Sequence, residues 1–392
     1  MLLLLGLALQ GTLHTNERWV LRARPYGAFR ASDLALQTVQ EDDTALAEGE
    51  VLVAVETLSI EAFYRTTLDE EAYHGSTALG GVVPALGLGK VVASNSRKVR
   101  VLAALHSNTA PAQRAACSTP LARRRARQLK AGAMVLGMLG AQTLARVPAA
   151  GLQAAAALPG TRRTDALGRM GISGLTAWIG VTSVLGPPKK GQTVVVSAAA
   201  GAVGSLAAQI ARARGARVIG IAGGEAKCAY LRERLRLDGA IDYKSGARSV
   251  GEQLDALAPE GVDFFFDNVG GPTLDAVLAR LKLRARVVIC GGIHYYATGD
   301  QNKGAVVGPS EYLKLAERGA TMKGYNVMQY LPRKLPAFLC KMLYLVWRGR
   351  VVMDEHVEHG IASFAKAMEL MFAGGHTGKL LVNVSAAAAA TA

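Results

Sequence analysis

The second half of the chain alternates short apolar segments with amphipathic ones, beginning near residue 193. The apolar segments are rich in valine, isoleucine and phenylalanine, as expected of strands that are buried on both faces. They predict strands over residues 193–198, 216–223, 239–243, 262–268, 285–292 and 320–327. The intervening segments predict helices over 204–214, from 226 onward, and near 250–257. Strands that alternate with helices in this way predict an α/β domain with a doubly wound parallel sheet.

The first part of the chain has a different pattern. Between residues 19 and 92 the apolar residues form β-rich runs bounded by turn residues, notably over 19–25 and 49–60. This stretch shows no long helical periodicity, so it predicts a mostly β domain. A length of 392 residues is sufficient for two such domains, each with its own core.

Positive charge is concentrated in one window of the chain. The formal net charge is +15, and nine of these charges come from the Lys and Arg residues between Arg97 and Lys130, where no Asp or Glu occurs. Such a run is a reason to consider nucleic-acid binding. The window contains no aromatic residue, so it lacks a stacking surface for single strands. We keep nucleic-acid binding as an alternative function but expect no nucleic-acid partner.

The same window interrupts an otherwise regular β pattern. Residues 99–129 are rich in Ala, Arg, Ser and Pro and show neither strand nor helix periodicity. We interpret them as a disordered insertion in a surface turn, which the domain tolerates because loop-closure entropy grows slowly with length. Whether this segment and residues 1–15 belong to the mature protein stays open.

The chain ends and the cysteines add few constraints. The start MLLLLGLALQG is either a targeting segment or an N-terminal extension, assigned to residues 1–15, and residues 386–392 predict a disordered tail. No apolar run reaches the ~18–20 residues that span a bilayer. The four cysteines lack CxxC spacing, so we expect neither a metal site nor a disulfide framework, and a reducing, cytoplasmic location fits.

A glycine-rich turn follows the first strand of the α/β domain. The stretch AAAGAVG, residues 198–204, connects this strand to a helix. Gly201 lets the backbone approach a pyrophosphate, and Gly204 lets helix and strand pack closely. Ala202 and Val203 complete the turn, where the helix start offers free N–H groups to the anion. Because strand, turn, helix and second strand are all present, the pattern predicts a dinucleotide site.

The end of the second strand distinguishes the two nicotinamide cofactors. NAD enzymes place an acid there for the ribose 2′-hydroxyl, whereas NADP enzymes place a cation for the 2′-phosphate. No acid stands directly at this strand end; Glu225 is close, and Lys227 follows at the start of the next helix. The sequence therefore favours NADPH as the cofactor.

Five stretches, AAAGAVGS, GGEAKCAYL, IDYK, FDNVGG and ICGGIHYY, follow one another in the α/β half. In this order they resemble the zinc-independent medium-chain dehydrogenase/reductases, in particular the NADPH-dependent alkenal double-bond reductases that include the prostaglandin reductases. The resemblance implies a GroES-like β-rich catalytic domain around an inserted Rossmann domain. We place the catalytic domain at 16–164, the Rossmann domain at 165–345 and the return to the catalytic domain at 346–385. The resemblance also suggests a homodimer.

Roles for individual residues follow from the same resemblance. Lys227 and Tyr243 would hold the 2′-phosphate, and Asn268 would hydrogen-bond the cofactor. The segments after the fifth strand and at the end of the sixth would line the nicotinamide pocket. These further contacts are Cys290, Gly291, Ile293, Tyr295, Tyr296, Tyr325, Asn326 and Val327. His376 stands where the family commonly has Asn, so its cofactor contact departs from the family pattern.

The implied reaction is hydride addition to the β-carbon of an α,β-unsaturated aldehyde or ketone, which produces an enolate. The sequence lacks the Gly-His-Glu stretch and the four-Cys lobe of zinc dehydrogenases, so hydrogen bonds must meet the charge on the substrate oxygen. Tyr296 is the candidate donor because a phenol stays protonated at neutral pH. Tyr64 is a candidate substrate contact. Two alternatives stay open: the α-carbon proton comes from Tyr296 or from water, and the substrate is an enone or enal, or instead a quinone.

Overall fold

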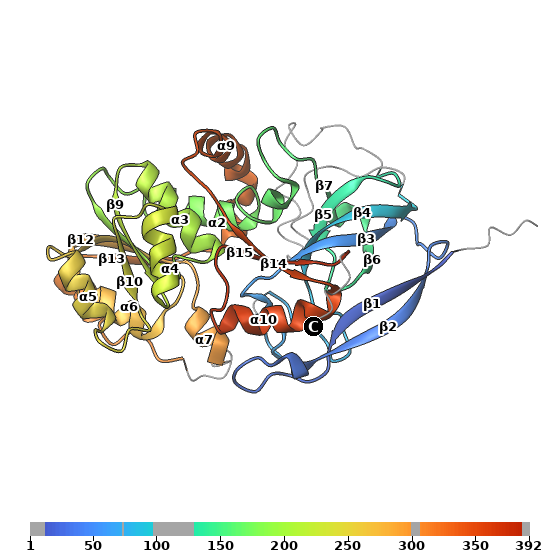
Figure 1. Cartoon of the computed structure of the whole chain (residues 1–392), viewed down its shortest axis with the longest axis horizontal. Helices are drawn as coiled ribbons and strands as arrows, with labels where there is room; N and C mark the ends of the chain where they lie inside the picture. The colour runs from blue at the N-terminus through green and yellow to red at the C-terminus, as the bar shows by residue number, and fades with distance from the viewer. Residues whose placement is uncertain (1–11, 73, 97–128, 299–305, 386–392) are drawn as a thin grey trace, which may run out of the picture.

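The computed structural model describes residues 12–72, 74–96, 129–298 and 306–385, which form two lobes (Figure 1). One lobe combines the β-rich N-terminal part of the chain with its C-terminal strands, and the other holds the α/β part. The two-part α/β organisation predicted from the sequence is confirmed. The domain boundaries assigned above stay predictions.

The α/β lobe is built on a six-stranded parallel sheet. Its order is β10-β9-β8-β11-β12-β13, so the strand order reverses between β8 and β11, as in a Rossmann fold. All six strands lie within or overlap the predicted segments. Their bounds are β8 Thr193–Val196, β9 Arg217–Ala222, β10 Gly239–Asp242, β11 Val262–Asp267, β12 Leu281–Ile289 and β13 Thr321–Gly324.

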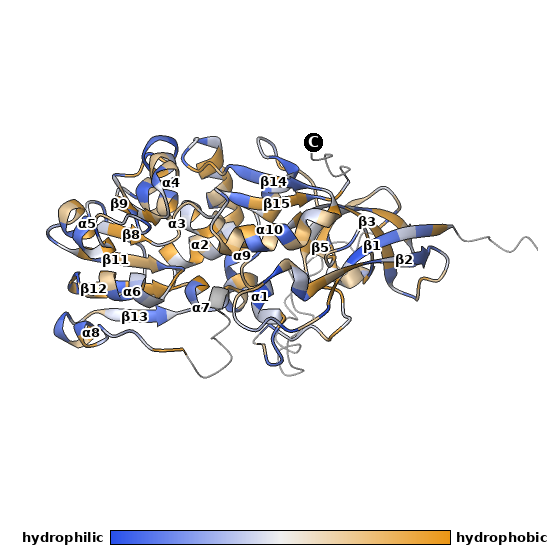
Figure 2. Ribbon diagram, turned by 60° about the horizontal axis from the view of Figure 1, so that its bottom comes forward, coloured by the Kyte–Doolittle hydropathy of each residue, from blue (hydrophilic) through white to orange (hydrophobic). Residues whose placement is uncertain are grey.

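Helices cover both faces of this sheet, as Figure 1 shows. Successive strand residues point to opposite faces, so Val194 and Val196 of β8 join one core while Val195 joins the other. The helices of the lobe are α2 Ile172–Thr182, α3 Ala202–Ala213, α4 Glu225–Ala229, α5 Val250–Leu257, α6 Gly271–Leu278, α7 Ile293–Thr298, α8 Leu313–Glu317 and α9 Val327–Trp347. Figure 2 shows α2 as hydrophobic over most of its length, which agrees with its packing against α3 and α9.

Five of these helices were not predicted from the sequence, namely α2, α6, α7, α8 and α9. For α9 and α2 the reason is clear. The sequence of α9 contains two prolines, which disfavour a helix interior, and α2 is apolar all round and so lacks an amphipathic period. The two helices pack against each other, with the rings of Trp178 and Phe338 6.1 Å apart. Tertiary contacts therefore stabilise both segments as helices, although their local sequences do not predict them.

The second lobe contains a seven-stranded sheet of order β14-β15-β3-β4-β5-β7, with β6 paired to β3. The C-terminal strand β15 pairs antiparallel with β3, so the end of the chain completes the sheet begun by the N-terminal part, as the resemblance implies. The bounds are β3 Glu50–Ser59, β4 Leu86–Ser94, β5 Met134–Met138, β6 Leu144–Pro148, β7 Gln153–Ala154, β14 Glu355–His359 and β15 Lys379–Asn383.

A separate antiparallel pair, β1 and β2, and helix α10 complete this lobe. β1 begins at Leu13, so the last residues of the predicted extension 1–15 belong to the fold, and the strand ends at Leu21 rather than extending through 19–25. Remaining elements are β1 Leu13–Leu21, β2 Leu34–Asp42, α1 Tyr64–Thr67, α10 Phe364–Phe372, short helical turns at Ala31–Asp33, Ala149–Gly151, Arg163–Leu167 and Ile361–Ser363, and a π-helical turn at Tyr230–Arg234.

The basic window lies between two neighbouring strands. β4 and β5 pair antiparallel, with Lys90 opposite Met134. Leu129, the last residue of the predicted insertion, is buried in the core of this lobe. Residues 97–128, and with them the insertion and the nucleic-acid hypothesis, lie outside the described residues, as do residues 1–11 and the predicted tail.

Within the described ranges, no helix is long and apolar enough to cross a membrane. The homodimer and the cytoplasmic location stay predictions.

Candidate active site

A cavity of about 2590 Å³ lies between the two lobes, at the carboxyl ends of the Rossmann strands. Its walls include the segments after β8, β9, β11 and β12 on one side, and the end of β3 with the start of β4 on the other. In open α/β sheets ligands bind where the strand order reverses, which here is between β8 and β11. All predicted cofactor contacts except Tyr295 line this cavity.

The glycine-rich turn lies directly after β8, as predicted. Gly201 is the N-cap of α3, and no described side chain caps this helix end, so its first N–H groups remain available to an anion. A Cβ added at Gly204 would lie 2.2 Å from the Ala198 carbonyl oxygen, whereas one added at Gly201 would meet only that oxygen, at 3.4 Å. Gly204 is therefore required for packing, while Gly201 keeps the wall open beside Ala202 and Val203.

Lys227 and Tyr243 meet at one end of the cavity, where the 2′-phosphate was predicted to bind. Lys227 Nζ donates to the Gly374 carbonyl oxygen at 2.7 Å, and the Tyr243 ring lies directly over Gly223. Burial, followed by the nearby charge of Lys244, lowers the pKa of Lys227. Glu225 turns away to pair with Arg232 on the surface. This corner therefore presents a cation and a phenol, and no carboxylate from Glu225.

His376 lies beside this corner and lines the cavity. Burial lowers its pKa to about 4, and the positive charges of Lys227, His356 and Lys379 add to the effect. The imidazole is therefore neutral at physiological pH. Its Nδ1 is buried and has no hydrogen-bond partner in the part of the chain that the structure describes. An orphaned ring nitrogen next to Lys227 fits a site that a polar ligand completes.

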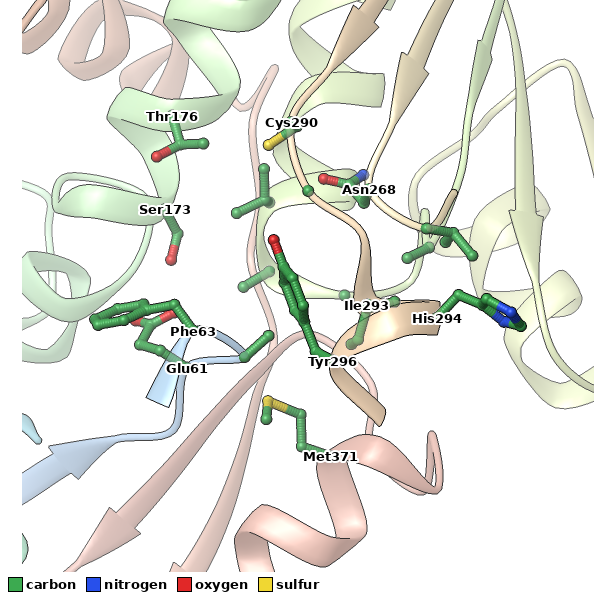
Figure 3. A pocket seen from close by; sticks show the side chains of 18 of the residues that line it. Glu61, Phe63, Ser173, Thr176, Asn268, Cys290, Ile293, His294, Tyr296 and Met371 are labelled. Carbon is green, nitrogen blue, oxygen red and sulfur yellow. The ribbon is translucent and has the colours of Figure 1, made fainter. Parts of the chain in front are cut away.

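Asn268 directly follows β11 and lines the cavity. Its Nδ2 donates to the Ser197 carbonyl oxygen at 2.7 Å, and Figure 3 shows its amide oxygen on the cavity side. The preceding Asp267 is fully buried and accepts from Ser197 Oγ at 2.7 Å and from the N–H groups of Val269 and Gly270 at 3.0 Å. Burial raises the pKa of Asp267. Asp267 thus holds the two strand ends that present Asn268.

Cys290 and Tyr325 close the inner end of the cavity. Tyr325 donates its phenol proton to the Thr176 carbonyl oxygen at 2.7 Å and lies 3.4 Å from Cys290 Sγ. Burial raises the pKa of Cys290 to about 12, so the thiol is protonated and is not a nucleophile. Gly291, Ile293, Asn326 and Val327 line the adjoining wall.

Tyr296 stands in the middle of the cavity on α7. In Figure 3 its phenol points up between the α2 side, which carries Ser173, and the Rossmann side, which carries Asn268. Burial raises the pKa of Tyr296, so its hydroxyl stays a proton donor at neutral pH. The residue predicted to meet the substrate oxygen is therefore both protonated and placed in the cavity.

Two family models match the chain: residues 17–119 match an N-terminal domain of oxidoreductases, and residues 202–341 match the zinc-binding dehydrogenases. The chain is 37% identical over 265 residues to YfmJ of Bacillus subtilis, which is named as an NADP-dependent oxidoreductase; the match covers 66% of this chain and 74% of that relative. The chain belongs to the medium-chain dehydrogenase/reductase family.

The chain is also similar to a plant reductase and to a solved structure that contains NADPH. The NADP-dependent 2-alkenal reductase of Nicotiana tabacum is 37% identical over 218 residues, covering 56% of this chain and 61% of the relative. The crystal structure of CurA from Vibrio vulnificus in complex with NADPH is similar with a TM-score of 0.79 and 28% identity, over 95% of this chain and all of that one. The family resemblance stated from the sequence is confirmed.

Two residues that were predicted to contact the substrate or the cofactor, Tyr64 and Tyr295, do not line the cavity. Tyr64 is fully buried in the catalytic-domain core, where its hydroxyl accepts from the Leu86 N–H at 2.6 Å, so it supports the scaffold and does not face the cavity. Tyr295 packs against Gly270 and donates to the Val307 carbonyl oxygen at 2.9 Å, outside the cavity wall. The hydroxyl group of each tyrosine already forms a hydrogen bond within the protein.

Other cavity residues were not predicted from the sequence. Glu61 follows β3, and its Oε1 accepts from Lys379 Nζ at 2.5 Å and from Ser59 Oγ at 2.6 Å. Lys379, only 1% exposed, reaches it from the crossover strand β15. The remaining unpredicted members of the wall include Phe63, Ser173, Thr176 and Met371 (Figure 3). The only sequence signal is that Glu61 and Phe63 lie between the end of β3 and the predicted Tyr64.

Among the described residues of this medium-chain dehydrogenase/reductase, no group of three or more His, Cys, Asp or Glu is placed to hold a metal ion.

Proposed function

We propose that this protein is an NADPH-dependent reductase of the carbon–carbon double bond of α,β-unsaturated aldehydes and ketones. The observation that carries the proposal is one cavity that joins a cation-lined corner, Lys227 with Tyr243, to the protonated phenol of Tyr296. The name of the tobacco relative, a 2-alkenal reductase, supports the substrate class.

The residues present fit NADPH. The helix start at Gly201 would receive the pyrophosphate, and Lys227 with Tyr243 would receive the 2′-phosphate. His376 Nδ1, buried without a described partner, would gain one on binding. Asn268 and the wall from Cys290 to Ile293 would surround the nicotinamide. The CurA structure that contains NADPH supports this cofactor.

The chemistry of the cavity suits enolate formation. When bound, the nicotinamide supplies a hydride to the β-carbon of the substrate. The π electrons of the double bond then move onto the carbonyl oxygen, and Tyr296 donates a hydrogen bond to that oxygen. A proton at the α-carbon, from Tyr296 or from water, completes the saturated carbonyl product. No acid with a lowered pKa is needed, because the phenol remains protonated.

The alternative is an NADPH quinone oxidoreductase on the same scaffold. A quinone would also accept a hydride and place negative charge on an oxygen, so the cavity does not separate the two substrates by itself. The preference for alkenals and enones rests on the relative's name and on Tyr296, which would donate to a single carbonyl oxygen.

Steady-state assays with trans-2-hexenal, 3-buten-2-one and 1,4-benzoquinone, each with NADPH and with NADH, test the proposal. We expect NADPH oxidation with the first two compounds and saturation of their double bond, and a KM for NADH at least about tenfold higher than for NADPH. The Lys227→Ala variant should remove most of that cofactor preference. NADPH oxidation with the quinone alone would reject the double-bond assignment.

A further inference from the structure

Ser173 lies in the first turn of α2, where this helix faces the cavity. Its side chain is among the residues that line the cavity, and Figure 3 shows its hydroxyl directed into that space. The residue is 1% exposed, and its Oγ has no hydrogen-bond partner among the described residues. A buried hydroxyl without a partner destabilises a protein, so its partner is expected to be a bound molecule.

The helix that carries Ser173 is a second reason to expect a negatively charged partner. α2 is 11 residues long, and no described side chain caps its N-terminus at Gly171. A Cβ at Gly171 would lie 2.0 Å from the Ala166 carbonyl oxygen, so the tight approach of these two backbones fixes where the helix begins. The positive end of the helix dipole therefore lies at the cavity wall, beside the Ser173 hydroxyl.

The surroundings do not oppose a negative charge at this position. Glu61 is the carboxylate of this part of the wall, and the buried Lys379 ammonium pairs with it at 2.5 Å. The pair is neutral as a whole. Tyr296 faces the same pocket from α7, on the side away from α2 (Figure 3). Two hydroxyl donors from different elements therefore converge on one space.

We propose that Ser173 is a catalytic residue that donates a hydrogen bond to the carbonyl oxygen of the substrate, as the second donor beside Tyr296. This inference rests on the proposed reduction of unsaturated carbonyl compounds. The hydride adds to the β-carbon and the π electrons move to the oxygen. The enolate then takes a proton at the α-carbon from Tyr296 or from water, which restores the carbonyl group. Ser173 forms no covalent bond and keeps its proton. Its hydrogen bond strengthens as the oxygen gains charge, so it acts on kcat.

The test compares Ser173→Ala with wild-type protein, using trans-2-hexenal and NADPH. We expect kcat to fall about 10- to 100-fold with KM changed less than about twofold. The Kd for NADPH, measured by fluorescence titration without substrate, should stay unchanged. Tm should stay equal or rise, because the substitution removes an unpartnered hydroxyl. Ser173→Thr, which keeps the hydroxyl, should restore most of the activity.

Ser183→Ala, at the other end of α2, is the matched control and should keep wild-type kcat. A double variant of Ser173→Ala with Tyr296→Phe should lose less activity than the product of the two single losses, since both donors serve one oxygen. An unchanged kcat in Ser173→Ala would overturn the inference. A loss of kcat that accompanies a weaker Kd for NADPH would also overturn it, because Ser173 would then contact the cofactor.

The two levels of inference fail in different ways. If the wild-type protein does not reduce trans-2-hexenal, the proposed function fails and the role of Ser173 fails with it. If the wild-type protein reduces trans-2-hexenal and Ser173→Ala does so equally well, only the role of Ser173 fails.

Discussion

The two walls of the cavity are built in different ways. The cofactor wall consists of the segments that follow the carboxyl ends of parallel strands, with Gly201 after β8, Asn268 after β11 and Cys290 after β12. The substrate wall combines segments that are far apart in sequence: Glu61 after β3, Ser173 in α2 and Met371 in α10. The cofactor wall is therefore set by local strand–turn–helix order, whereas the substrate wall depends on the packing of distant segments.

This difference shows where single residues are hard to replace. On the cofactor wall, glycines set the distance between backbones. A methyl group at Gly204 would collide with the Ala198 carbonyl oxygen, whereas one at Gly201 would fit within the protein itself. On the substrate wall, the ion pair of Lys379 with Glu61 connects the C-terminal strand to the N-terminal part. Breaking this pair would loosen two distant segments of the same lobe, the end of β3 and the start of β15.

The largest expected effect is on the cofactor wall. Gly204→Ala places a Cβ 2.2 Å from the Ala198 carbonyl oxygen, so we expect the free energy of unfolding to fall by about 3 kcal/mol in urea titrations. Gly201→Ala meets that oxygen only at 3.4 Å and should change stability by less than about 0.5 kcal/mol. It should nevertheless weaken NADPH binding about tenfold or more, since a methyl group would stand where the backbone approaches the pyrophosphate. Equal stability of the two variants would contradict this account of the turn.

Tyr296, which lines the cavity, and Tyr64, which is buried in the core, should respond differently to substitution by Phe. Tyr296→Phe should lower kcat for an alkenal about 100-fold while leaving Tm within a few degrees, because it removes a donor in the cavity. Tyr64→Phe should keep kcat within about twofold. It should lose about 1–3 kcal/mol of stability in urea titrations, because the buried Leu86 N–H loses its acceptor. A loss of activity in Tyr64→Phe at unchanged stability would instead indicate that Tyr64 contacts the substrate.

The smallest expected effect concerns His376 and pH. Its pKa in the folded protein is about 4, below the ordinary value of 6.5, so the unfolded chain binds a proton more readily than the folded one between these values. Stability should therefore fall as pH decreases from about 6.5 toward 4. In His376→Asn, the loss of unfolding free energy between pH 7 and pH 5 should be smaller than in the wild type by about 1–2 kcal/mol. Equal losses, measured by urea titration at both pH values, would show that the imidazole is not held neutral.

Sequence reasoning succeeded where strand, turn and helix follow each other directly. Helix α5 occupies the predicted residues, and the turn from 198 to 204 has the predicted form, because hydrophobic period and glycine position are local properties. It failed for Tyr64 and Tyr295. Both are aromatic residues next to the cavity wall, and the sequence does not contain the rotation of α1 or α7 that turns one phenol inward and another away.

The sequence by itself determined the six parallel strands of the Rossmann half, its dinucleotide turn and the preference for a cation at the second strand, because these depend on residues close together in the chain. Only the tertiary structure decided that Lys379 meets Glu61 across more than 300 residues, that α2 points its uncapped end and Ser173 into the cavity, and that α9 forms a helix through two prolines. These features come from packing between distant segments, whose free energy no local pattern records.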